Sequence, residues 1–297
     1  MKKKYWFLIL AILVASVIWN VYWNSTIIVH TYTHAGEDVP EDFDGCRIVQ
    51  LTDIHSVRSE KQMQLIYDTT MGQEPDIICI TGDLVDSRYY ATHGVEGEKL
   101  TLTLVEELVK LAPVYFIYGN HEMILLDDPK NNEFKVALEE LGVQIINNEM
   151  IRCAKEKGGE SVYIGGIQDP STLYKDYRYA FLSGNGERME AMLDAVTVGV
   201  RNEDFFLLLS HRPEYLEMYD QYPVDLVLAG HAHGGQFRLP FIGGVYAPGQ
   251  GFLPKYTAGL YETDDLEMYV GTGIGNSVIP VRIFNPPEIL TIILEAK

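Results

Sequence analysis

Side chains that can bind a metal ion follow three apolar stretches in the first half of the chain. In chain order they are Asp53 and His55, then Asp83 and Asp86, then Asn120 and His121. A mixture of carboxylate, imidazole and amide groups suits a divalent transition metal. A carboxylate has two oxygens, so a residue such as Asp83 can bridge two cations. Each block alone also fits an ordinary turn after a strand, and the prediction depends on their repetition.

Two further blocks continue this pattern in the second half of the chain. His211 follows the apolar run from Phe205 to Leu209, and Gly230-His231-Ala232-His233 follows residues 226–229. Imidazole is the commonest protein ligand for transition metals near neutral pH. The spacing of His231 and His233 therefore favours a metal site. The isolated residues His30, His34 and His93 are typical of surface or turn positions, and we assign them no role.

The elements that must position these residues are short buried strands alternating with amphipathic helices. This alternation predicts a layered α/β domain. The expected strands cover residues 47–52, 76–81, 114–118, 143–146, 150–154, 162–167, 205–209, 226–229, 267–271 and 289–294, and the expected helices cover 60–71, 98–111, 133–141 and 187–196. Open α/β sheets gather their sites at the carboxyl ends of the strands, which is where the polar blocks fall.

The N-terminus predicts a membrane segment. Lys2, Lys3 and Lys4 precede a nearly continuous apolar stretch of 19 residues, 5–23. As a helix it would be about 28 Å long, close to the hydrocarbon thickness of a bilayer. The lysines predict a cytoplasmic N-terminus and an extracytoplasmic remainder. A cleaved secretory signal is the alternative, although no convincing cleavage site follows. We expect an anchor over 1–23, a polar tether over 24–44 and one catalytic domain over 45–297.

The charge and cysteine content of the chain limit the kinds of molecule that it is expected to bind. The formal net charge is −19, and the segment 1–23 contributes three lysines and no acid, so the remainder is more acidic still. Such a surface repels phosphate backbones, so nucleic acid is not an expected partner. The scattered residues Cys46, Cys79 and Cys153 form neither a disulfide framework nor a zinc knuckle, and we expect ordinary packing roles for them.

Taken together and in order, the five blocks resemble the signature of the calcineurin-like metallophosphoesterase superfamily. The resemblance extends from Asp53 to His233 and implies a four-layer αββα sandwich with the site at its top. The apolar N-terminus, the continuation Gly234-Gly235-Gln236 and the run from Gly271 to Gly275 are similar to the bacterial YkuE-like and YaeI-like membrane-anchored phosphodiesterase branch.

The resemblance also implies roles for the site residues. Asp53, His55 and His233 would bind one metal ion, Asn120, His211 and His231 the other, and Asp83 both. His121 would contact the phosphate and protonate the leaving group, with Asp86 orienting it. The cofactors would be two divalent ions, and Mn, Fe and Zn all suit mixed oxygen and nitrogen ligands.

We therefore expect a phosphodiesterase or pyrophosphatase acting on lipid-linked or nucleotide-linked phosphates at the membrane. The alternatives are a broad phosphomonoesterase or nucleotidase, and a catalytically silent interaction module on the same fold. The aromatic stretch 173–181 fits either an acyl or sugar pocket or ordinary packing. The sequence leaves the oligomeric state open.

Overall fold

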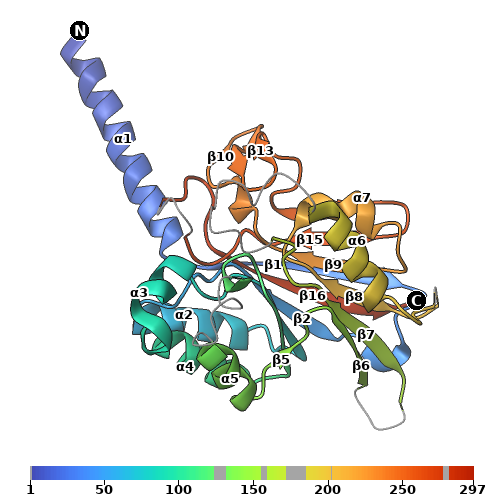
Figure 1. Cartoon of the computed structure of the whole chain (residues 1–297). Coiled ribbons are helices and arrows are strands. Elements are labelled where there is room, and N and C mark those ends of the chain that lie inside the picture. The colour runs from blue at the N-terminus through green and yellow to red at the C-terminus, as the bar shows by residue number, and fades with distance from the viewer. Residues whose placement is uncertain (1, 124–131, 155–158, 172–184, 202, 277–280) are drawn as a thin grey trace.

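Strands buried on both faces form the centre of the molecule in the computed structural model (Figure 1). The structure describes residues 2–123, 132–154, 159–171, 185–201, 203–276 and 281–297. The first sheet has the order β1 (Ile28–Gly36), β16 (Glu288–Ala296), β2 (Arg47–Leu51), β3 (Ile77–Thr81), β4 (Val114–Ile117) and β5 (Gln144–Ile145). The second has the order β14 (Gly259–Glu262), β15 (Glu267–Val270), β9 (Leu226–Ala229), β8 (Phe206–Leu209), β7 (Ser161–Gly166) and β6 (Glu149–Ala154).

Helices cover the outer faces of the two sheets. Those described after the N-terminal helix are α2 (Glu60–Met71), α3 (Ser87–Gly97), α4 (Lys99–Leu108), α5 (Asn132–Glu140), α6 (Asn185–Val196) and α7 (Leu216–Tyr219). Residues of α2, α4 and α5 pack on the first sheet, and residues of α6 and α7 pack on the second. A third apolar cluster joins the inner faces of the sheets. The predicted four-layer αββα sandwich is therefore confirmed.

The central strands β3, β4, β8 and β9 are almost entirely apolar because both of their faces are covered. In β3, Ile78 and Ile80 pack toward the helices, whereas Ile77 and Cys79 pack between the sheets. Successive side chains of a strand point to opposite faces, so one run of five residues fills two cores. The helix α2 begins where Ser59 accepts a hydrogen bond from the backbone N–H of Gln62.

The first sheet contains one strand that the sequence analysis placed in a tether. Residues 28–36 form β1, which pairs in parallel with β16 along its whole length. The structure thus differs from the expected tether over 24–44. The run Ile-Ile-Val-His-Thr-Tyr-Thr is rich in β-branched residues, which favour strands, but its polar members indicated a loop. The β1 strand places the end of the N-terminal helix directly beside the body.

The helix α1 (Lys2–Asn24) projects away from the body (Figure 1). It includes one segment, Tyr5–Asn24, that is long and apolar enough to cross a membrane. Its described side chains are largely exposed, so α1 has an apolar surface that the body does not cover. Asn24 donates a side-chain hydrogen bond of 2.9 Å to the carbonyl of Arg282, which ties the end of α1 to the domain.

Candidate metal centre

The predicted ligands lie on loops that follow β2, β3 and β4 of the first sheet and β8 and β9 of the second. Hydrogen bonds join these loops to one another. The backbone N–H of His55 donates to the carbonyl of Asp83 at 2.9 Å within the first sheet. The N–H of His231 donates to Asp53 Oδ2 at 3.0 Å and so connects the two sheets. The carboxyl ends of the strands thereby bring residues up to 180 positions apart to one place.

Five of these residues have backbone conformations that are costly for side chains other than glycine. Their φ angles are 51° at Asp53, 52° at His55, 52° at Asp83, 64° at His231 and 46° at His233. The left-handed region costs an L-residue about 1–2 kcal/mol. Such outliers persist only where surrounding bonds hold them, and they cluster at functional sites. Here they direct five potential ligands inward.

Glycines permit the close approach of these loops. A Cβ on Gly82, whose φ is 93°, would lie 2.6 Å from Nδ1 of His211. A Cβ on Gly230 would lie 2.0 Å from the Thr52 hydroxyl. No larger residue fits at either point unless a neighbour moves, which explains why Gly precedes both Asp83 and His231.

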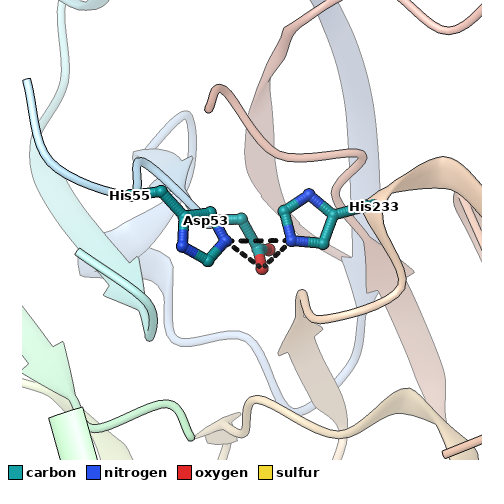
Figure 2. A group of neighbouring side chains, drawn as sticks. All are labelled: Asp53, His55 and His233. Carbon is teal, nitrogen blue, oxygen red and sulfur yellow. Dashed lines mark hydrogen bonds and ion pairs between the residues drawn. The ribbon is translucent and has the colours of Figure 1, made fainter. Parts of the chain in front are cut away.

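One cluster consists of Asp53, His55 and His233 (Figure 2). Nε2 of His233 lies 3.2 Å from Oδ1 of Asp53 and 3.0 Å from Nε2 of His55. All three side chains are buried. Two facing ring nitrogens can share only one proton, whereas a cation can accept a lone pair from each.

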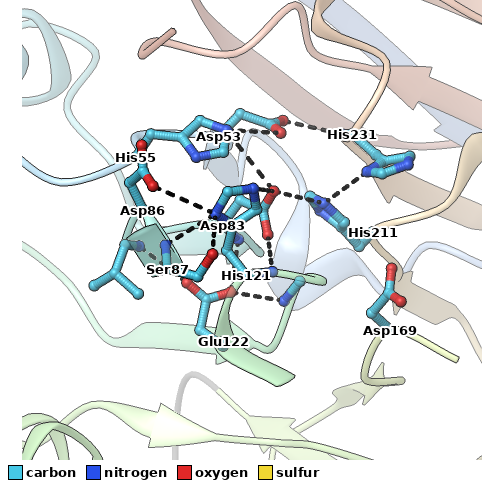
Figure 3. Close-up of polar contacts among 12 residues, drawn as sticks. Asp53, His55, Asp83, Asp86, Ser87, His121, Glu122, Asp169, His211 and His231 are labelled. Atoms are coloured by element: carbon cyan, nitrogen blue, oxygen red, sulfur yellow. Dashed lines mark hydrogen bonds and ion pairs between the residues drawn. The ribbon is translucent and has the colours of Figure 1, made fainter. Parts of the chain in front are cut away.

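A second cluster consists of Asp83, His211 and His231 (Figure 3). Nε2 of His211 lies 3.3 Å from Oδ2 of Asp83 and 3.2 Å from Nδ1 of His231. The same Oδ2 lies 3.8 Å from Nε2 of His55 in the first cluster. One carboxylate oxygen therefore faces both clusters.

Buried polar atoms without a hydrogen bond test whether the site suits metal ions. Among the described residues these atoms include Oδ1 of Asp53, Oδ1 of Asn120 and Nε2 of His231. An unpaired buried polar atom costs about 1–3 kcal/mol. The Asp53 and Asn120 oxygens are typical metal-ligand atoms that a bound cation would satisfy, whereas His231 faces its cluster through Nδ1. The donor set therefore fits divalent ions.

The electrostatics of the site favour cation binding. Burial lowers the pKa values of His55 and His231 well below the usual value for histidine. Burial also lowers the pKa of His233, to about 4, so all three rings are neutral at pH 7. Burial opposes ionisation of Asp83, but the surrounding imidazoles, above all His211, hold its pKa well below the usual range.

His211 differs from its neighbours. Burial lowers its pKa, but the charge of Asp83 outweighs this effect and raises the pKa to about 10. A cation that binds His211 must displace this proton, so metal binding at this cluster is coupled to proton release.

His121 lies at the edge of the clusters and has a partner that the sequence did not indicate. The backbone N–H of Ser87 donates to its Nδ1 at 3.0 Å (Figure 3). A backbone N–H can only donate, so this bond places the proton of the neutral ring on Nε2. That nitrogen lies 4.0 Å from Oδ2 of Asp83, on the side of the clusters. His121 is thus arranged to donate a hydrogen bond from Nε2.

Asp86 contacts His121 less directly than the sequence analysis expected. Its Oδ1 lies 3.9 Å from Nδ1 of His121, beyond hydrogen-bond distance. Its side chain instead accepts from the N–H groups of Arg88 and Tyr89 and caps the start of α3. This cap holds Ser87, the first residue of α3, in place.

Glu122 is a second contributor to which the sequence analysis assigned no role. Its buried carboxylate accepts hydrogen bonds from the backbone N–H groups of Asp83, Val85 and Gly119 at 2.8–2.9 Å. Burial and the charge of Asp83 raise its pKa to about 8. Glu122 thus joins the loops after β3 and β4. Its position beside Asn120 and His121 was the only signal available in the sequence.

We expect Glu122→Gln to lower both stability and metal affinity. An amide has one acceptor oxygen and an NH₂ group that would oppose a backbone N–H, so at least one buried donor loses its partner, at about 1–3 kcal/mol. The free energy of unfolding in urea and the metal content of the purified protein measure the two effects.

The matched control is Glu98→Gln. Glu98 is also buried, but its partners are the hydroxyls of Ser56 and Thr101, which can rotate to accept from an amide. We expect this variant to keep its metal. Equal metal loss in both variants would contradict the role of Glu122.

A cavity of about 620 Å³ adjoins the first cluster. Its walls include His55 and Asp86 from the site, Arg58 and Arg88 beside them, and Asn24 from the end of α1. Both guanidinium groups bond the one carboxylate of Asp86, at 3.2 and 3.1 Å, so this wall keeps an excess positive charge. The cavity therefore suits an anionic ligand that lies between the site and α1.

The family model for calcineurin-like phosphoesterases matches residues 46–235, a span that contains every ligand described above. This chain belongs to that family. As a member, the phosphoesterase is a hydrolase of phosphate esters, and its Asp and His clusters are suited to divalent metals.

Individual proteins of similar sequence support the same family assignment. The uncharacterized metallophosphoesterase YkuE of Bacillus subtilis is 28% identical over 87% of the phosphoesterase and 82% of its own length. Phosphodiesterase YaeI of Escherichia coli is 26% identical over 82% and 81%, respectively. A transmembrane protein with metallophosphoesterase domain from Danio rerio is 29% identical over 87% of this chain and 55% of its own length. The predicted superfamily and its YkuE-like and YaeI-like branch are confirmed, whereas the role of each site residue stays a prediction.

Proposed function

We propose that this chain is a membrane-anchored phosphodiesterase or pyrophosphatase that uses two divalent cations and acts on lipid-linked or nucleotide-linked phosphates. The observation that carries the two-cation proposal is the position of Asp83 Oδ2, which faces both clusters. In two-metal sites the ions lie about 3.5–4 Å apart, close enough to share one carboxylate.

The ligand atoms divide between two ions. Asp53, His55 and His233 would hold one, Asn120, His211 and His231 would hold the other, and Asp83 would contribute to both. Mn²⁺, Fe and Zn²⁺ all accept such oxygen and nitrogen sets. When bound, the ions polarise the phosphoryl group and lower the pKa of a water molecule.

The other residues position the substrate and stabilise charge. Nε2–H of His121 would donate a hydrogen bond to the oxygen that leaves phosphorus and stabilise the negative charge that develops on it, which assists departure of a poor leaving group. Ser87 keeps the proton on that nitrogen through its backbone N–H. Asp86 acts on His121 only indirectly, because its side chain caps the helix α3, which begins at Ser87.

The cavity supports a lipid-linked substrate. It lies between His55 and the end of α1, and it contains the excess positive charge of Arg58 and Arg88. An anionic head group bound there would lie beside the clusters. A site held near a bilayer also meets membrane substrates at a high effective concentration. The aromatic stretch 173–181 falls within the residues outside the described part of the structure.

Membrane anchoring rests on α1 and on the transmembrane relative. In this proposal residues 1–23 are the anchor with a cytoplasmic N-terminus, residues 24–44 connect it through β1, and residues 45–297 catalyse outside the cytoplasm. Signal cleavage and secretion is the alternative. The intact mass of protein extracted from membranes distinguishes them, because cleavage removes the N-terminal segment.

We expect the full chain with Mn²⁺ to hydrolyse bis-p-nitrophenyl phosphate and a lipid-linked diphosphate faster than p-nitrophenyl phosphate. Arg58→Gln should lower kcat/KM for the lipid substrate by roughly ten- to a hundredfold, because a charged hydrogen bond contributes about 1.5–3 kcal/mol. It should change hydrolysis of bis-p-nitrophenyl phosphate little, since that diester is too small to fill the cavity.

Lys135→Gln, which removes an exposed cation on α5, is the control and should behave as the parent. Hydrolysis of the monoester alone would favour the phosphomonoesterase or nucleotidase alternative. Hydrolysis of none of the three substrates, by protein that retains its metal, would favour the silent interaction module.

A further inference from the structure

Large apolar side chains are exposed in one region of the body. Outside α1, most of those more than a third exposed in the described residues fall between positions 239 and 284. We call six of them the apolar hairpin patch: Phe241, Ile242, Phe252, Leu253, Ile283 and Phe284. Phe241 is fully exposed, and Phe252 is 81% exposed. A concentration of exposed apolar side chains of this kind is typical of a protein or membrane contact.

Backbone hydrogen bonds join the chain segments that carry the patch. It is built on two small hairpins, β10 (Arg238–Leu239) with β11 (Gly243–Gly244) and β12 (Tyr246–Ala247) with β13 (Gly251–Phe252). Val245 N donates to Phe237 O and Leu253 N donates to Val245 O, both at 2.9 Å. Arg238 N donates to Ile283 O at 2.9 Å, which adds the segment 281–284.

The patch adjoins the end of α1. Asn24, the last residue of α1, donates its side-chain hydrogen bond to the carbonyl of Arg282, inside the segment that carries Ile283 and Phe284. Figure 1 shows the hairpins rising from the body on the side from which α1 projects. A bilayer crossed by α1 would therefore face the patch.

Charge and conformation separate this region from the rest of the chain. Residues 226–261 and 268–287 contain no Asp or Glu, although the chain has 42 acidic residues. Phe241, Leu253 and Phe284 have φ angles of 68°, 53° and 50°, which bulky residues rarely adopt. Neither core packing nor turn preference accounts for apolar residues there.

We infer that the apolar hairpin patch inserts into the surface of the bilayer that α1 spans, and so holds the cavity mouth at the lipid head groups. The patch has aromatic and aliphatic side chains at the hairpin tips and no acid in the hairpins, as an interfacial contact requires. The acidic remainder of the body would be repelled by anionic head groups and stays in water. The inference rests on the anchoring part of the proposed function.

Fluorescence depth measurements on the full chain test this insertion. An NBD label is placed on Phe252→Cys or Ile242→Cys in a Cys153→Ser background, because Cys46 and Cys79 are buried. The chain is reconstituted in nanodiscs of phosphatidylcholine and phosphatidylglycerol, with or without spin-labelled lipid. The control site is Val136→Cys on α5, which lies at the opposite end of the body from the hairpins (Figure 1).

We expect emission at shorter wavelength and loss of intensity with spin-labelled lipid at positions 242 and 252, and neither change at 136. The same emission and intensity at all three positions would overturn the inference. A shift that lipid quenchers do not affect, and that disappears at one chain per nanodisc, would also overturn it and assign the patch to contacts between copies.

A separate result concerns the anchor. If alkaline washing releases the chain from membranes, the anchoring proposal fails. The insertion of the patch can then still be tested by adding vesicles that contain spin-labelled lipid. Quenching of the NBD label at position 252 by these vesicles supports insertion, and no quenching overturns it. Phe241→Ser gives an independent readout, with an expected loss of activity toward vesicle-embedded substrate and unchanged hydrolysis of bis-p-nitrophenyl phosphate.

Discussion

Asp83→Asn is expected to lose both cations and nearly all activity. Oδ2 of Asp83 lies 3.3 Å from Nε2 of His211 and 3.8 Å from Nε2 of His55, so one substitution alters both clusters. The amide has the same shape but no charge and only one acceptor oxygen. Metal ions supply several kcal/mol of transition-state stabilisation, and each 1.36 kcal/mol is a factor of ten in rate. We expect kcat/KM for bis-p-nitrophenyl phosphate to fall on the order of 10³-fold or more.

The measurement pairs that rate with the metal content of the purified protein. Asp204→Asn, which neutralises a partly buried carboxylate paired with the exposed Arg201, is the control and should match the parent in both readouts. Thermal unfolding confirms that the variant is folded. A folded Asp83→Asn protein with full metal content and unchanged rate would refute the bridging role.

His121→Ala is expected to keep its metal ions and lose rate. Its Nε2–H is directed toward the clusters by the Ser87 N–H bond to Nδ1, and one hydrogen bond to developing negative charge typically contributes about 10²–10³-fold in rate. The loss should be larger for an alkyl phosphodiester than for a p-nitrophenyl ester, because nitrophenolate spreads its negative charge over the ring and needs less stabilisation. The comparison of the two substrates therefore separates a hydrogen-bond donor to the leaving oxygen from a residue that only binds phosphate.

His93→Ala is the matched control for that variant. His93 lies exposed on α3, where its ring contacts the carbonyl of Tyr89 away from the clusters. It should leave both substrates unaffected. His121 also lies in a group with His55 and Asp83 that could hold a cation. If His121→Ala loses one metal ion per chain, His121 is a ligand, and the assignment as donor is wrong.

Local pattern predicted most of the fold. Residues 77–80 of β3 and all residues of β8 are apolar, which indicates strands covered on both faces, and the structure places helices and a second sheet there. The helix over 60–71 was predicted with its observed bounds, and in the structure Ser59 caps its start. The position of each polar block after a strand then followed from the general geometry of α/β sheets.

The features that sequence reasoning missed depend on contacts between distant residues. The strand β1 is stabilised by β16, more than 250 positions away, and its polar residues resemble a linker when read alone. The Ser87 contact to His121 and the three amides on Glu122 join separate loops, so spacing along the chain does not reveal them. The apolar hairpin patch is scattered in sequence and becomes a surface only when the hairpins and residues 281–284 pack together.

Metal titration tests the central claim most directly. The full chain is stripped with a chelator, Mn²⁺ is added in known amounts, and hydrolysis of bis-p-nitrophenyl phosphate is followed together with bound metal. The two clusters and the shared Asp83 predict that activity returns in full only when about two equivalents are bound per chain. Full activity in the stripped protein, or with a single bound ion, would contradict the two-cation site.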